Sequence, residues 1–79
     1  MFKNKISIVG GAGHIGLPLS VKFSEKKFIV NIVDTNFNNL QLIQNGQLPF
    51  KEVGLVKKLS QQLRTGRLLF SKELNSIKD

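Results

Sequence analysis

The chain alternates short runs of branched apolar residues with longer segments in which apolar residues recur every three or four positions. Two runs of the first kind extend from Lys5 to Gly10 (KISIVG) and from Phe28 to Asp34 (FIVNIVD), and a shorter one from Arg67 to Phe70 (RLLF). Runs of this kind, bounded by glycine or by an acid, predict strands. We expect the first strand to be buried on both faces of a sheet.

The segment from about Gly13 to Lys26 has the spacing of a helix. Its apolar residues Ile15, Leu19 and Phe23 stand at positions i, i+4 and i+8, so we expect this face to pack on the sheet. Pro18 lies inside the segment, where it would delete one backbone hydrogen bond of the helix.

Two further helices are expected after the second strand. Asn36 caps the first of them, and Asn45 and Gly46 end it in a left-handed turn. Its apolar residues are Phe37, Leu40 and Ile43. A connecting segment from Gln47 to Gly54 follows, in which Pro49 prevents the helix from continuing.

The helix after this connection is marked by a second apolar stripe. The stripe consists of Leu55, Val56, Leu59 and Leu63. Arg64, Thr65 and Gly66 stop the helix before the third strand. A last short helix is expected from Ser71 to Ile77.

A glycine-rich turn joins the first strand to the first helix. The pattern G-x-G-x-x-G, which binds diphosphates when it stands between a strand and a helix, is present from Gly11 to Gly16 (GAGHIG). We expect Gly11 to allow the tight turn, Gly13 to let the backbone approach the diphosphate, and Gly16 to let the helix lie close to the strand. Free N–H groups and the helix dipole would stabilise the anion.

Asp34 closes the second strand, eighteen residues after Gly16. A carboxylate at this place can accept hydrogen bonds from the ribose hydroxyls of adenosine and would repel the 2′-phosphate of NADP. The next residues, from Thr35 to Phe37, include no arginine that would accommodate that phosphate, so the sequence predicts NAD as the cofactor. A smaller role stays open for Asp34, which could cap the turn that follows it.

His14 has two alternative roles in the first turn of the helix. Its ring could donate a hydrogen bond to phosphate, or the residue could contribute mainly its backbone N–H from the surface, and we favour the second role. Catalysis by His14 is not expected, because the nicotinamide would lie far from the adenine half of the cofactor.

The order of these elements, β-α-β-α-α-β-α, predicts an α/β fold, the first half of a Rossmann doubly wound parallel sheet with three strands and flanking helices. In the strand order 3-2-1-4-5-6, strand 4 lies beside strand 1. The sequence ends where strand 4 would begin, which would leave strand 1 at an open edge. We therefore expect residues 1–79 to be the N-terminal part of an NAD-binding Rossmann domain of a longer protein, with the substrate and catalytic domains absent.

Composition excludes several kinds of chemistry. The 79 residues include no cysteine, so a disulfide, a thiolate metal site and a cysteine nucleophile are excluded, and the single histidine argues against zinc. Twelve Lys and Arg against five Asp and Glu give a net charge of +7, but the lysines are scattered and all six aromatic residues are Phe, so nucleic acid is not expected as a partner. No apolar run is long enough for a membrane helix or a secretory signal, which predicts a cytoplasmic protein.

Four segments of the chain together carry a family resemblance. They are GAGHIGLPL from Gly11 to Leu19, Val33-Asp34, PFKEVGL from Pro49 to Leu55, and Gly66-Arg67-Leu68. Their order and spacing resemble the N-terminus of the UDP-glucose/GDP-mannose dehydrogenase family, which has G-x-G-x-[VI]-G-L-P, an acid, P-x-x-E-x-G-L and G-x-L-x-[FV]. A histidine stands at position 14, where the family usually has tyrosine. In this feature the sequence is most similar to UDP-N-acetylmannosamine dehydrogenase-like members.

The resemblance implies an activity and a set of contacts. The family oxidises the C6 hydroxymethyl group of a nucleotide sugar to a carboxylate in two NAD-dependent steps, and its cofactor contacts map to His14 and Ile15. The family's catalytic cysteine, its assisting lysine and its sugar-nucleotide domain lie beyond position 79 in relatives. The resemblance therefore places no catalytic residue in this chain, and a UDP-sugar substrate and any oligomer belong to the complete enzyme. Asn39 stands where relatives often have Lys or Arg near the adenosine, and Asn36 replaces a frequent second acid.

Two alternatives stay open. The turn from Gly10 to Gly16 (GGAGHIG) also resembles that of extended short-chain dehydrogenases, including sugar-nucleotide epimerases. Those enzymes usually have Thr before the glycines and Ser-His after them, whereas here Val9 precedes and Leu17-Pro18 follows. The chain could also be a nucleotide-binding module, or a remnant, without chemistry of its own. We do not expect the isolated chain to oxidise nucleotide sugars.

Overall fold

The computed structural model describes residues 4–72 of the chain. Its elements are β1 (Lys5–Val9), α1 (Gly16–Glu25), β2 (Ile29–Val33), α2 (Phe37–Gln44), α3 (Leu55–Leu63) and β3 (Leu68–Ser71). The three strands form one parallel sheet in the order β1-β2-β3. The expected α/β architecture of three parallel strands with flanking helices is confirmed. Ser71 ends β3, and residues 73–77 of the last expected helix lie outside the described residues.

The register of the sheet brings the carboxyl ends of the strands to one edge. Val9 of β1 pairs with Val33 of β2, and Val33 pairs with Ser71 of β3. The glycine turn follows β1 and Asp34 follows β2, so both lie at this edge. Ligands of α/β sheets bind at the carboxyl ends of the strands.

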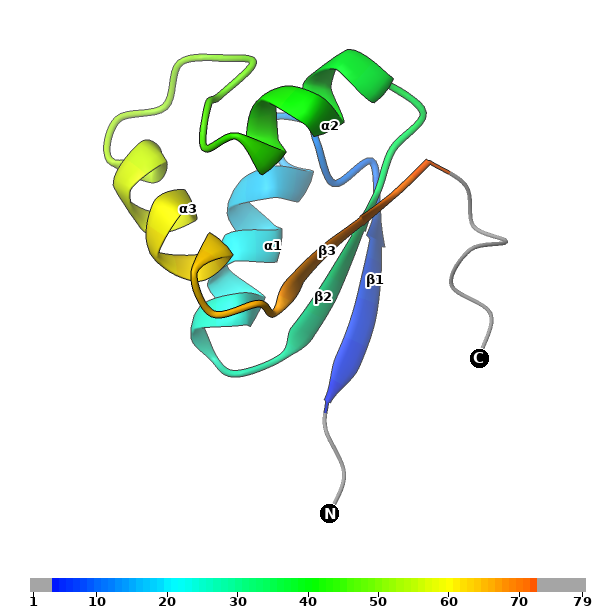
Figure 1. Ribbon diagram of the computed structural model, residues 1–79, viewed down its shortest axis with the longest axis vertical. Helices are drawn as coiled ribbons and strands as arrows, with labels where there is room; N and C mark the ends of the chain where they lie inside the picture. The colour runs from blue at the N-terminus through cyan, green and yellow to red at the C-terminus, as the bar shows by residue number, and fades with distance from the viewer. Residues whose placement is uncertain (1–3, 73–79) are drawn as a thin grey trace.

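All three helices lie on the same side of the sheet (Figure 1). α1 contacts each of the three strands and also α3. Right-handed crossovers place successive helices on one face when the strand order runs in one direction. The core between the helices and the sheet includes Leu17, Val21, Val30, Ile32, Leu40, Ile43 and Leu59.

The expectation that β1 is buried on both faces is wrong. Ile6 and Ile8 are half-buried on the side of the helices, whereas Lys5, Ser7 and Val9 are exposed. No helix of residues 4–72 covers this second face, which explains the alternation. Within the same residues β1 is an edge strand, as expected.

Of the three residues expected to pack α1 on the sheet, Phe23 is half-buried against the core, whereas the other two are exposed. Ile15 is 83% exposed and Leu19 is 43% exposed. The buried residues of the helix are Gly16, Leu17, Ser20, Val21 and Ser24. Serine can take core positions here because its hydroxyl group has an acceptor: Ser20 Oγ donates to the carbonyl group of Gly16 at 2.7 Å.

Pro18 does not interrupt the helix. Because α1 begins at Gly16 rather than at Gly13, Pro18 lies in its first turn. The N–H groups on either side, of Leu17 and Leu19, donate to the carbonyl groups of Gly13 and Ile15 at 3.0 and 3.3 Å, so the helical pattern continues past the proline. Pro18 has no N–H to donate to the carbonyl group of His14 between them, and this is the bond whose loss was expected.

The caps of the second helix were predicted correctly. The Asn36 side chain accepts a hydrogen bond from the N–H of Asn39 at 3.0 Å, and Gly46 has a φ of +80°. In α3, Leu55 and Leu59 are buried as expected. Val56 is half-exposed instead, and Gln62 is the third buried residue of this helix.

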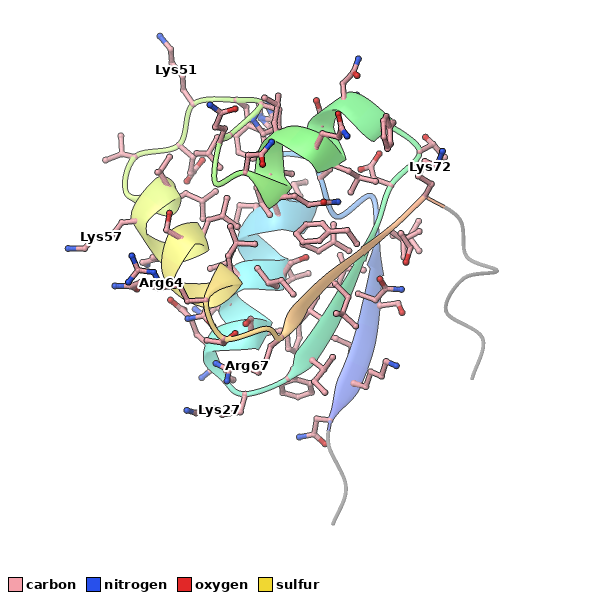
Figure 2. The ribbon with its side chains drawn as sticks, viewed as in Figure 1. Lys27, Lys51, Lys57, Arg64, Arg67 and Lys72 are labelled. Atoms are coloured by element: carbon pink, nitrogen blue, oxygen red, sulfur yellow. The ribbon has the colours of Figure 1, made fainter. Side chains whose placement is uncertain are left out.

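A buried polar cluster joins α1, α3 and β3. Ser24 Oγ donates to Gln62 Oε1 at 2.7 Å, and Arg67 Nη2 donates to the same oxygen at 3.2 Å. Arg67 Nε donates to the carbonyl group of Ser24 at 3.0 Å, which places a cation at the carboxyl end of α1. Figure 2 shows Arg67 where α3 leads into β3. These bonds hold both helices against the third strand.

Candidate functional site

The glycine turn leaves β1 through a left-handed residue. That residue is Gly10, with a φ of +77°, which directly precedes Gly11. The N–H groups of Gly10 and Gly11 donate to the carbonyl group of Val33 at 2.7 and 3.1 Å. A Cβ on Gly11 would lie 2.8 Å from both Ile32 Cγ2 and the carbonyl oxygen of Ile8. Gly11 is therefore required by the close approach of the turn to β2.

Gly16 allows α1 to approach the turn. A Cβ on Gly16 would overlap the carbonyl oxygen of Gly10 and would lie 2.7 Å from the Cα of Gly11. Both obstacles are backbone atoms, which cannot move aside as the end of a flexible side chain can. This is the close approach that we expected at Gly16.

Three consecutive N–H groups at the start of α1 are free of acceptors among residues 4–72. They belong to His14, Ile15 and Gly16. The next N–H group, of Leu17, donates to the carbonyl group of Gly13 at 3.0 Å and so begins the helical pattern. A helix N-terminus with free donors carries a partial positive charge and binds anions.

A Cβ would have room beside Gly13. A Cβ on Gly13 would meet only the carbonyl oxygen of Gly10, at an ordinary distance of 3.5 Å. The protein itself therefore does not require glycine here, in contrast to Gly11 and Gly16. A diphosphate bound close to the backbone would require it, because a side chain would fill the place of the anion.

The Asp34 carboxylate links the end of β2 to the glycine turn. Its Oδ2 accepts a hydrogen bond from the N–H of Ala12 at 3.0 Å, and its Oδ1 accepts one from the N–H of Asn36 at 2.9 Å. The second contact is the capping role that the sequence left open, and the first was missed. A carboxylate has about four acceptor positions, so it can hold these contacts and still accept from ribose hydroxyls.

His14 lies against an aromatic ring from a distant segment. The ring centroids of His14 and Phe50 are 4.4 Å apart, with an angle of 40° between the ring planes. Phe50 belongs to the connection between α2 and α3, so this connection reaches the glycine turn. Sequence reasoning missed Phe50, because nothing in the pattern of an irregular connection tells which element it contacts.

A cation lies close to the loop that follows Asp34. Lys72 Nζ is 4.9 Å from the centroid of the Phe37 ring. The N–H of Asp34 donates to the carbonyl group of Ser71 at 3.1 Å, which brings the end of β3 beside this loop. Figure 2 shows Lys72 there, next to the start of α2. The residues directly after Asp34 include no basic side chain, whereas Lys72 comes from the end of β3.

The other labelled basic side chains project from different elements. Figure 2 shows Lys57 on α3, Arg64 directly after it, Lys51 on the connection before it, and Lys27 at the opposite end of α1 from the glycine turn. No three His, Cys, Asp or Glu side chains in the described part of the chain are grouped so that they could hold a metal ion. Over the same residues, every helix is too short or too polar to cross a membrane.

The fold and the turn together define a class of protein. A parallel sheet in the order β1-β2-β3, a G-x-G-x-x-G turn after β1 and an acid after β2 are the defining features of a Rossmann-type dinucleotide-binding domain.

Comparison with known proteins identifies the family. Residues 4–79 match the NAD binding domain of the UDP-glucose/GDP-mannose dehydrogenase family, and the chain belongs to this family. It is 32% identical over 72 residues to the UDP-glucose 6-dehydrogenase of Rhizobium meliloti (strain 1021), a match that covers 91% of this chain and 16% of that protein. Family membership decides between the two resemblances of the turn, against the extended short-chain dehydrogenases.

Solved structures of two family members have the same fold. The UDP-N-acetyl-mannosamine dehydrogenase from Staphylococcus aureus matches with a TM-score of 0.80 and 37% identity, over 86% of this chain and 16% of that chain. The GDP-mannose dehydrogenase from Pseudomonas aeruginosa matches with a TM-score of 0.83 and 32% identity, over 90% of this chain and 16% of that chain. The chain thus spans 16% of the length of these relatives.

Proposed function

We propose that NAD binds at the carboxyl edge of the sheet, over the glycine turn. The diphosphate lies beside Gly13 and accepts hydrogen bonds from the free N–H groups of His14, Ile15 and Gly16. Gly11 keeps the turn against β2 so that these groups face the ligand. The observation that carries the proposal is the open space at Gly13, since a residue that the protein does not need as glycine is explained by a ligand.

We propose that Asp34 binds the ribose of the adenosine. Its carboxylate is held by the N–H groups of Ala12 and Asn36, so it is already oriented when the ligand arrives. A fixed negative charge accepts hydrogen bonds from the two ribose hydroxyls and repels a 2′-phosphate, which favours NAD over NADP.

The family suggests the reaction of a complete enzyme. We propose that this chain is the NAD-binding segment of a cytoplasmic nucleotide-sugar dehydrogenase that oxidises the C6 hydroxymethyl group of a UDP-sugar to a carboxylate. NAD supplies the hydride acceptor for such an oxidation. Two hydrides leave the alcohol carbon in all, and water supplies the second carboxylate oxygen. Substrate and any oligomer contacts belong to the complete enzyme.

We propose further that these 79 residues alone bind NAD without oxidising a sugar. The sequence has no cysteine to carry the acyl intermediate that the family resemblance implies. Incubation of the chain with UDP-glucose or UDP-N-acetylmannosamine and NAD is expected to produce no NADH absorbance. A rise in that absorbance, lost when the sugar is left out, would overturn this part of the proposal.

Binding is tested by amide NMR spectra of the chain with three ligands. NAD and ADP are expected to shift the N–H signals of His14, Ile15 and Gly16, because both carry a diphosphate. Adenosine is expected to shift signals near Asp34 and to leave those three nearly unchanged. A folded sample whose spectrum does not change at millimolar NAD would contradict the proposal.

A further inference from the structure

We propose that Phe50 is a positioning residue for the cofactor. Its ring holds His14, and through His14 it fixes the orientation of the free N–H groups that receive the diphosphate. This inference rests on the proposed function, because it concerns the same site. Phe50 itself lies outside the glycine turn and Asp34, the features that define dinucleotide binding in the sequence.

The two residues of this ring contact differ in how deeply they are buried. Phe50 is half-buried and packs against the hydrophobic core, whereas His14 is exposed. With centroids 4.4 Å apart and planes tilted by 40°, the rings are in direct contact. Phe50 is thus the anchored partner, and His14 is the residue whose freedom the contact restricts.

The segment that carries Phe50 is fixed on both sides. Leu48, before it, packs against the core, and Leu55, after it, is only 6% exposed. Pro49 fixes one further backbone dihedral directly before the ring. The position of Phe50 is therefore set by the core and not by the exposed turn that it contacts.

Packing of this segment on α1 is incomplete beyond Phe50. Glu52, Val53 and Leu55 line, together with Pro18 and Lys22 of α1, an open pocket of about 230 Å³. The Phe50 ring contacts the glycine turn, at His14, before the segment reaches this pocket.

Fixing His14 affects the donors directly. His14 provides the first of the three free N–H groups, and Ile15, which provides the second, is 83% exposed and has no core contact to hold it. Donors that are already oriented lose less conformational freedom when an anion binds, so affinity rises without any new contact. Loss of the Phe50 ring is therefore expected to weaken diphosphate binding although Phe50 donates no hydrogen bond.

The test measures the dissociation constant for NAD by titration calorimetry in the 79-residue chain. Phe50→Leu keeps an apolar side chain but removes the ring, and Phe50→Tyr keeps the ring. Phe28→Leu is the matched control, because it breaks the aromatic pair that Phe28 forms with Phe23 at the other end of α1, with centroids 5.1 Å apart. We expect Phe50→Leu to raise the dissociation constant for NAD about two- to tenfold. Phe50→Tyr and Phe28→Leu should leave it unchanged.

Adenosine binding and amide order parameters separate positioning from a loss of stability. Phe50→Leu is expected to leave the adenosine affinity unchanged and to lower the amide NMR order parameters of His14, Ile15 and Gly16 without NAD. Equal NAD binding by wild type and Phe50→Leu would overturn the positioning role and leave the proposed function intact. Equal weakening by Phe50→Leu and Phe28→Leu would also overturn it, as a purely structural effect. A folded wild type that does not bind NAD would instead overturn the proposed function.

Discussion

The N–H of Ala12 donates a hydrogen bond to Asp34 Oδ2 at 3.0 Å, and so links the glycine turn to the end of β2. The two residues are 22 positions apart in the sequence, and each belongs to one of the two elements of a dinucleotide site. The carboxylate expected to bind ribose therefore also fixes the turn expected to bind diphosphate. Changes at Asp34 should affect both parts of the cofactor.

Removing this carboxylate should weaken NAD binding strongly. Hydrogen bonds to charged groups contribute on the order of 1.5–3 kcal/mol, so Asp34→Ala is expected to raise the dissociation constant about 10- to 100-fold. Titration calorimetry measures the change. Glu25→Ala removes an equal charge at the far end of α1. It should leave the NAD affinity within about twofold of the wild-type value, because a distant exposed charge contributes little to binding. Equal affinity of wild type and Asp34→Ala would remove the assigned role.

Selectivity between the two cofactors should depend on the charge of Asp34. We expect wild type to bind NAD more tightly than NADP, and Asp34→Asn to bring the two dissociation constants closer together. Asparagine keeps an oxygen that can accept from Ala12 but no longer repels the 2′-phosphate. Parallel titrations with NAD and NADP measure the ratio. A ratio that does not change in the variant would show that the carboxylate does not discriminate.

Gly16 should be essential for stability. Its Cβ would collide with the backbone of Gly10 and Gly11, so Gly16→Ala is expected to lower the free energy of unfolding by about 1–3 kcal/mol. Gly13→Ala is the matched control, because its Cβ has only one neighbour, at an ordinary distance. Urea unfolding followed by circular dichroism compares the two variants. Similar midpoints for both would contradict the packing described for α1.

The buried polar cluster should also contribute to stability. Gln62→Leu removes the oxygen that accepts from Ser24 and Arg67, and it is expected to cost about 1–3 kcal/mol of unfolding free energy. Gln61→Leu makes the same change at the exposed neighbouring position and should cost less than about 0.5 kcal/mol. Equal losses in the urea midpoint would show that the hydrogen bonds of Gln62 are not the cause.

The strand–turn–helix unit was predictable because residues close together in the sequence determine it. The branched run of β1 favours extended backbone and the spaced glycines allow a tight turn, so their order along the chain predicts the strand, the turn and the helix. The cap at Asn36 and the left-handed Gly46 were predictable for the same reason.

Features that depend on contacts between distant segments were not predictable. Apolar spacing favoured Ile15 and Leu19 as core residues, whereas the structure buries Ser20 and Ser24, whose hydroxyl groups find acceptors only once the fold has formed. Phe50 is an unremarkable apolar residue in an irregular connection until the structure places it against His14.

The affinity of a Gly13 variant for NAD tests the central claim most directly. Since the protein leaves space for a Cβ at this position, Gly13→Val is expected to remain folded, as circular dichroism can verify. Its side chain would occupy the place of the diphosphate, so titration calorimetry should show NAD binding weakened by at least about tenfold, equivalent to about 1.4 kcal/mol. A folded Gly13→Val chain that binds NAD as tightly as wild type would contradict the account.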